Sequence, residues 1–125
     1  MLYSGLDVAT VDREFIRSMH RAGLPLEKVP ARRLARITVQ LSRVLDLSDP
    51  AVLATLGVSP SEVMGDDVAV SQRLGAAAHH LGYEAILAPS AAGHGMVLAL
   101  FLDTRAAESV VEVASVDDAY TPQST

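Results

Sequence analysis

The 125-residue sequence predicts a single α+β domain, and three observations support that prediction. Apolar residues return at helical spacing over 7–22, hydrophobic and polar residues alternate over 35–41, and apolar runs typical of strands fill 85–88 and 96–102. With further helical patterns between them, the order is helix, strands, helices and strands. This order differs from the regular alternation of a doubly wound parallel sheet. A chain of this length is expected to form one hydrophobic core.

The composition excludes several classes of protein. Half of the residues are hydrophobic and the net charge is -5, which describes a globular chain with little general attraction for nucleic acid or anionic membranes. The absence of cysteine excludes disulfides and thiolate chemistry. No apolar run reaches the length of a membrane span, and the N-terminus does not resemble a signal peptide. We therefore expect a cytoplasmic protein.

The first half of the chain begins with an amphipathic helix. Val11 and Phe15 lie on the apolar face of the helix predicted over 7–22, and a glycine follows its end. A proline-containing break separates it from the alternating segment 35–41, which predicts a half-buried strand. A second short strand is predicted over 44–47.

The middle of the chain carries three helix starts. Pro50 follows a Ser-Asp pair, an arrangement typical of a capped first turn. Ser59 and Glu62 have the spacing of a capping box and predict a short helix. A longer helix follows over 66–81 and ends at a glycine.

The last part of the chain returns to strands. The runs 85–88 and 96–102 are separated by about seven residues, which is short enough for a hairpin or for adjacent strands. Another strand is predicted over 109–113. Because the C-terminal residues are mostly polar, we expect a folded domain over 1–115 and a loose tail over 116–125.

The residues alone give weak indications of a site. Ser90 follows a strand run and opens a loop of small residues, which is where binding sites are often built, although an ordinary turn has the same composition. Glu14 lies at the edge of the apolar face of its helix. His79 and His80 are adjacent and lack a third ligand at a recognised spacing, so we predict no metal site.

Five features of the sequence are informative through their common order and spacing, although none of them is specific alone. Tyr3 and Glu14 stand eleven residues apart, 45–53 reads LDLSDPAVL, 82–91 reads GYEAILAPSA, and 97–101 reads VLALF. Together they resemble the RES domain, the toxin of RES-Xre toxin-antitoxin pairs. In that family a tyrosine at a strand end is followed eleven residues later by a glutamate on a helix. The resemblance covers about residues 2 to 102.

The resemblance implies a fold and a chemistry. The fold would be ADP-ribosyltransferase-like, with a mixed sheet and flanking helices, and the activity would be cleavage of NAD at the nicotinamide-ribose bond by phosphorolysis or hydrolysis. By analogy, Glu14 would hold ribose hydroxyls or stabilise the developing positive charge. Ser90 would fix the substrate through a hydrogen bond, and Tyr3 would stack on it or border it. NAD would be the substrate, with no further cofactor.

Two departures from the family pattern bear on activity. The family arginine precedes the strand that contains the tyrosine, and a chain that starts at Met1 has no room for it. Ala92 stands where a Pro-Ser-Ala-Arg motif would place another arginine. We therefore expect an N-terminally truncated RES domain with weak or absent NAD cleavage. The alternative is an inactive remnant or a binding module.

The expected partners follow from the same resemblance. They are NAD and an Xre-type helix-turn-helix antitoxin, with no direct nucleic-acid or membrane partner. A homodimer stays open as an assembly state.

Overall fold

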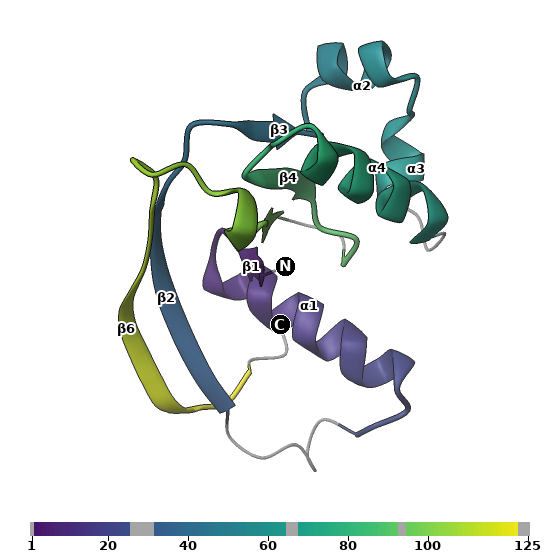
Figure 1. The fold of residues 1–125 in the computed structure, drawn as a ribbon. Helices are drawn as coiled ribbons and strands as arrows, with labels where there is room; N and C mark the ends of the chain where they lie inside the picture. The colour runs from purple at the N-terminus through teal and green to yellow at the C-terminus, as the bar shows by residue number, and fades with distance from the viewer. Residues whose placement is uncertain (1, 26–31, 65–67, 93–94, 123–125) are drawn as a thin grey trace.

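The computed structural model describes residues 2–25, 32–64, 68–92 and 95–122. Strands and helices alternate irregularly along the chain (Figure 1). In chain order they are β1 (Leu2–Gly5), α1 (Val8–Arg21), β2 (Arg32–Gln40), β3 (Val44–Asp46), α2 (Pro50–Leu56), α3 (Pro60–Met64), α4 (Val68–His80), β4 (Ala85–Pro89), β5 (Met96–Leu100), the 3₁₀ turn η2 (Leu102–Thr104) and β6 (Val110–Tyr120).

The central element is a four-stranded mixed sheet with the strand order β1-β5-β4-β3. β4 and β5 form the predicted antiparallel hairpin, in which Pro89 pairs with Met96. β3 is parallel to β4, and β1 is antiparallel to β5. The α+β class and the mixed sheet are thus confirmed. β1 was not predicted by periodicity, because four residues are too few to show an alternation.

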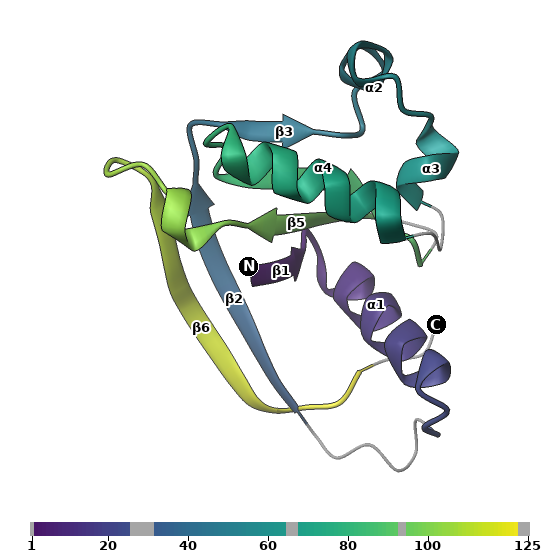
Figure 2. The same ribbon diagram turned by 45° about the vertical axis from the view of Figure 1, so that its right-hand side comes forward.

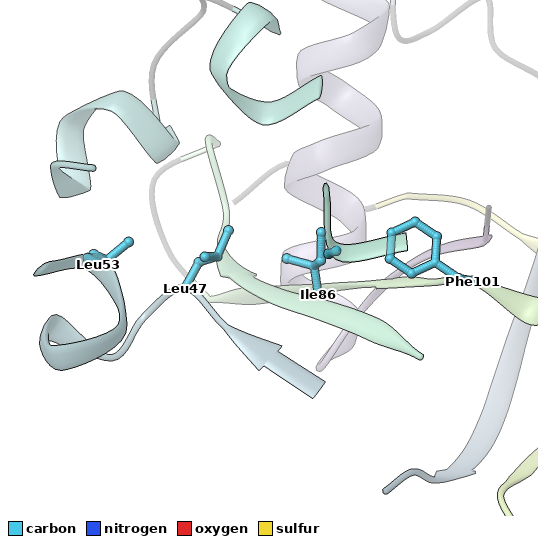
Figure 3. Packing of buried hydrophobic residues seen from close by; sticks show 5 residues of the cluster. Leu47, Leu53, Ile86 and Phe101 are labelled. Carbon is cyan, nitrogen blue, oxygen red and sulfur yellow. The ribbon is translucent and has the colours of Figure 1, made fainter. Parts of the chain in front are cut away.

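The two faces of this sheet are covered by different parts of the chain, one by helices and the other by a separate pair of strands. On one face Leu47, Leu53, Ile86 and Phe101 form a row of buried side chains under the helices (Figure 3). Helix α4 crosses this face and contributes Ala78 to the cluster (Figure 2). On the other face a second cluster forms around β4 and β5, and residues from the base of a separate ribbon cover it. This cluster comprises Ala85, Leu98 and Leu100, with Leu2, Leu41, Val44, Leu87 and Val111 packed against it.

The ribbon consists of β2 and β6, which pair antiparallel from Gln40–Val110 to Arg32–Tyr120. Two register shifts interrupt the pairing, and such irregularities bend a strand pair. The ribbon accordingly curves away from the sheet (Figures 1 and 2). Both strands are longer than the predicted 35–41 and 109–113.

The prediction of a loose tail over 116–125 is wrong for residues 116–120, because these residues form the end of β6. Polar composition suggested mobility, but two interactions hold this segment. Its backbone pairs with β2, and the Tyr120 hydroxyl lies 2.8 Å from each carboxylate oxygen of Asp12 in α1. The ribbon therefore packs with both of its ends against the rest of the domain.

Glu84 joins the base of the ribbon to the sheet. Its side chain is buried, and its carboxylate accepts hydrogen bonds from the backbone amides of Ser42 (2.6 Å) and Arg43 (2.9 Å), directly after β2. The other carboxylate oxygen accepts from the Ala106 amide (2.7 Å) and the Ser109 hydroxyl (2.5 Å), just before β6. These bonds, that of Ser109 first, lower the pKa of Glu84 to about 2.

The local helix signals are confirmed where the structure describes them. The Asp49 side chain caps α2 with Pro50 in its first turn, as predicted. The Asp7 side chain caps α1, which was not predicted. Ser59 and Glu62 form the reciprocal bonds of a capping box. The predicted start of the long helix at residues 66 and 67 lies outside the described residues. In the part of the chain that the structure describes, no helix is long and apolar enough to cross a membrane.

Candidate functional site

Ser90 and Glu14 meet although 76 residues separate them in the sequence. Ser90 follows the end of β4, and Glu14 lies in the second turn of α1. The Ser90 hydroxyl donates a hydrogen bond of 2.5 Å to Oε1 of Glu14. The structure thus brings together two of the three residues that the sequence suggested.

The Ser90 hydroxyl is fully enclosed and already has two partners. Its side chain is 0% exposed, it donates to Glu14, and it accepts a bond of 3.1 Å from the Ala92 amide. The Ser90 amide donates to the Gly95 carbonyl (3.0 Å), which closes the turn between β4 and β5. Glu14 is half-buried, and among the described residues its Oε2 has no hydrogen bond. The carboxylate is therefore the group of the pair with remaining capacity to bind.

A close contact between α1 and the start of β5 sets the position of Glu14. Thr10 is one helical turn before Glu14 and is completely buried. A Cβ on Gly95 would lie only 1.8 Å from the Thr10 hydroxyl, and Gly95 has a φ of +85°. Only glycine fits this approach, so the first turn of α1 rests directly on the strand that follows the Ser90 loop.

The opposite side of α1 is held by the far end of the ribbon. Asp12 is buried and accepts the bonds from Tyr120, and this interaction raises the pKa of the Tyr120 hydroxyl. The Arg32 guanidinium lies 4.7 Å from the ring centre of Phe15. Helix α1 is thus fixed between the sheet and the ribbon.

Tyr3, the third suggested residue, does not join this pair. It lies on β1 opposite Ala99, three positions along β5 from Met96, or about 10 Å along the strand. Its side chain is 75% exposed at the edge of the sheet. Tyr3 therefore lies apart from Glu14 and Ser90, at the exposed edge of the sheet.

A hollow of about 420 Å³ lies beside the pair. Its lining from α1 is strongly basic, and the loop after Ser90 supplies only small side chains. The lining residues are Arg13, Ile16, Arg17, His20 and Arg21 of α1, with Ala91 and Ala92 of the loop. Sequence reasoning missed this cluster. The four-residue spacing of the three arginines would have indicated one basic face of the helix.

A second hollow of about 510 Å³ lies over α4 and η2. Its walls include Gly75, Phe101 and a His79–Asp103 pair whose side chains are 2.7 Å apart. The hydrogen bond from His79 lowers the pKa of Asp103. No cluster of three or more metal-ligating side chains occurs in the described ranges.

The family model described as the RES domain matches residues 1–121. The chain belongs to the RES domain family. Its similarity to solved proteins agrees with this assignment. The structure superposes on a chain of the Mycobacterium tuberculosis MbcT-MbcA toxin-antitoxin complex with a TM-score of 0.77 and 27% sequence identity, covering 96% of this chain and 66% of the other.

Curated relatives of this RES domain include NAD(+) phosphorylases. A probable NAD(+) phosphorylase of M. tuberculosis is 40% identical over 72 residues, which is 57% of this chain and 34% of that protein. The NAD(+) phosphorylase MbcT of Mycobacterium bovis is 33% identical over 90 residues, or 70% of this chain and 48% of its own. The chain thus spans between a third and a half of the length of these relatives.

Proposed function

We propose that this RES domain cleaves NAD at the bond between nicotinamide and ribose, with the Glu14 carboxylate as the catalytic group. The observation that carries the proposal is the hydrogen bond between the Ser90 hydroxyl and Glu14 Oε1, formed inside a RES fold. It supports the analogy by which these two residues were selected. The names of the related NAD(+) phosphorylases support NAD as substrate.

The chemistry requires a negatively charged group close to the reacting carbon. When the bond between ribose C1′ and the nicotinamide nitrogen breaks, its electron pair moves to the nicotinamide ring and positive charge develops on the ribosyl group. Oε2 of Glu14 can stabilise that charge or accept a hydrogen bond from a ribose hydroxyl. A phosphate oxygen then bonds to C1′, or a water oxygen does so and releases a proton.

In this proposal Ser90 acts on the carboxylate rather than on the substrate. Its hydroxyl is enclosed and bonded to Glu14 and to the Ala92 amide, so its contribution is to orient Oε2. Tyr3 borders the ligand from the sheet edge. NAD as a substrate also implies a cytoplasmic location.

The test is release of nicotinamide from NAD by the purified chain, with and without inorganic phosphate. Glu14→Gln keeps the shape of the side chain and removes its charge, and it should lower kcat by about 10²–10³. Glu112→Gln, on the exposed ribbon, makes the same change elsewhere and should leave the rate unaltered. Equal rates for Glu14→Gln and the unmodified protein would overturn the role of Glu14. Formation of ADP-ribose phosphate would identify phosphate as the acceptor, and free ADP-ribose would identify water.

A second function is an antitoxin-binding module without turnover. The likeness to a chain in a toxin-antitoxin complex supports a protein partner, and we propose an Xre-type helix-turn-helix protein. Co-purification of the two proteins, combined with no nicotinamide release, would favour this function over the enzyme. A partner bound equally by the chain and by Glu14→Gln would show that binding does not depend on the site. Light scattering of the isolated chain would distinguish a homodimer from a monomer.

A further inference from the structure

The basic face of α1 concentrates positive charge in an acidic protein. The net charge of the chain is -5, yet Arg13, Arg17 and Arg21 lie at successive four-residue intervals in one hollow, together with His20. Residues at this spacing occupy one side of a helix. At 1.5 Å per residue, the three guanidinium-bearing positions extend over about 12 Å of the helix.

This hollow adjoins the Ser90–Glu14 pair at two points. Ala92 lines the hollow, and its amide donates the hydrogen bond to the Ser90 hydroxyl. Arg17 lies three residues after Glu14, so both side chains project from the same side of α1. Glu14 and Ser90 do not themselves line the hollow, but their neighbours Arg13, Arg17 and Ala91 do, so a ligand there would lie close to the pair.

The walls of the hollow match a phosphate-bearing ligand. Guanidinium groups bind phosphate oxygens through paired, charge-assisted hydrogen bonds. The opposite wall consists of Ala91 and Ala92, whose short side chains leave room. A volume of about 420 Å³ lies within the range of small-molecule sites.

We infer that the hollow between α1 and the Ser90 loop binds phosphate oxyanions through Arg17 and Arg21. The oxyanion is the pyrophosphate of a dinucleotide or an inorganic phosphate acceptor. This assignment of the ligand rests on the proposed function, because that function places a ribosyl carbon at Glu14. The loop after Ser90 has no arginine, because Ala92 stands where the family motif would place one. The positive charge of the hollow comes instead from the arginines of α1.

Isothermal titration calorimetry with pyrophosphate, orthophosphate and ADP-ribose tests the inference without any turnover. The double variant Arg17→Gln/Arg21→Gln should lose at least about tenfold in affinity for one of the three anions, and added salt should weaken the remaining binding less steeply. The double variant Arg73→Gln/Arg105→Gln removes the same charge from exposed positions on α4 and beside η2, and it should bind as the unmodified chain does. Circular dichroism and thermal melting identify any variant that fails to fold.

The anion for which the double variant loses affinity shows which phosphate group the hollow binds. Weaker binding of pyrophosphate and ADP-ribose would show that the hollow binds the pyrophosphate of a dinucleotide. Weaker binding of orthophosphate alone would show that it binds the inorganic phosphate acceptor. Equal affinities in both double variants, or no binding of any of the three anions by the unmodified chain, would overturn the inference. Anion binding that depends on Arg17 and Arg21 in a chain that releases no nicotinamide would support the inference and count against the proposed function.

Discussion

The Ser90 hydroxyl and the Glu14 carboxylate share a hydrogen bond of 2.5 Å that joins the turn between β4 and β5 to helix α1. Because the hydroxyl is fully buried and donates to Glu14, it is bonded to the carboxylate rather than exposed to a ligand. This relationship between the two residues can be measured by mutating each alone and both together.

Ser90→Ala should lower kcat for nicotinamide release by about tenfold to a hundredfold, less than Glu14→Gln does, since the charge remains but its orientation is lost. The double variant should be no slower than Glu14→Gln alone, because residues that act as a unit are not additive. Steady-state kinetics of the three variants check this. Fully additive losses would show that Ser90 acts independently of Glu14.

Gly95→Ala should destabilise the fold by about 2 kcal/mol or more, since the added methyl group meets the Thr10 hydroxyl and the φ of +85° is unfavourable for alanine. The same substitution at Gly75, within α4, finds no atom within 4 Å of the new Cβ and should stabilise the helix by about 1 kcal/mol. Urea unfolding of both variants measures the two opposite signs. Equal stabilities would contradict the close approach of α1 to β5.

Glu84→Gln should destabilise the protein by about 2–4 kcal/mol at neutral pH, because one amide cannot accept the four bonds that the buried carboxylate accepts. The matched variant Glu108→Gln changes an exposed residue of the neighbouring loop and should have little effect.

The pH dependence of the same variant has a defined sign. The pKa of Glu84 is about 2 in the folded protein against an ordinary 4.5, so the unfolded chain binds the proton first. The stabilisation is complete above pH 4.5 and is lost as the pH falls toward 2. The difference in unfolding free energy between the unmodified chain and Glu84→Gln should therefore narrow over this interval. A constant difference across it would refute the role of the ionised carboxylate.

Tyr120→Phe should lower the melting temperature, because Asp12 is buried and loses the hydroxyl bonded to both of its oxygens. Since the Tyr120 pKa is raised above its ordinary 10.0, the stabilisation is present below that pH and is lost as the pH rises through the folded value. Tyr3→Phe removes a hydroxyl from an exposed ring and serves as the control. Removal of 116–125 should destabilise the domain further, whereas a loose tail could be removed without effect.

Local signals made much of the fold predictable. Proline in the first turn of α2, the capping box of Ser59 and Glu62, and the apolar hairpin of β4 and β5 all depend on neighbours within a few residues. The ribbon gave a weaker signal, because most residues of β6 are exposed on both faces and do not alternate.

The site was less accessible to sequence reasoning. Glu14 and Ser90 were selected by resemblance, since a hydrogen bond across 76 residues leaves no local pattern. The sequence carries no local sign of the role of Glu84, because its four hydrogen-bond partners come from two distant segments. The basic face of α1 was visible in the spacing of its arginines, but only the fold places it beside the Ser90 loop.

The pairing of β1 with β5 has a consequence for synthesis on the ribosome. β1 is the first element of the chain and its sheet partner is Met96–Leu100, so it has no strand to pair with until that segment has emerged. Contacts at such sequence separation form late, after local hairpins and helices. Glu14 therefore has no Ser90 to bond with until the segment after β4 has been made. Any activity that needs both residues begins only after β5 has emerged and paired with β1.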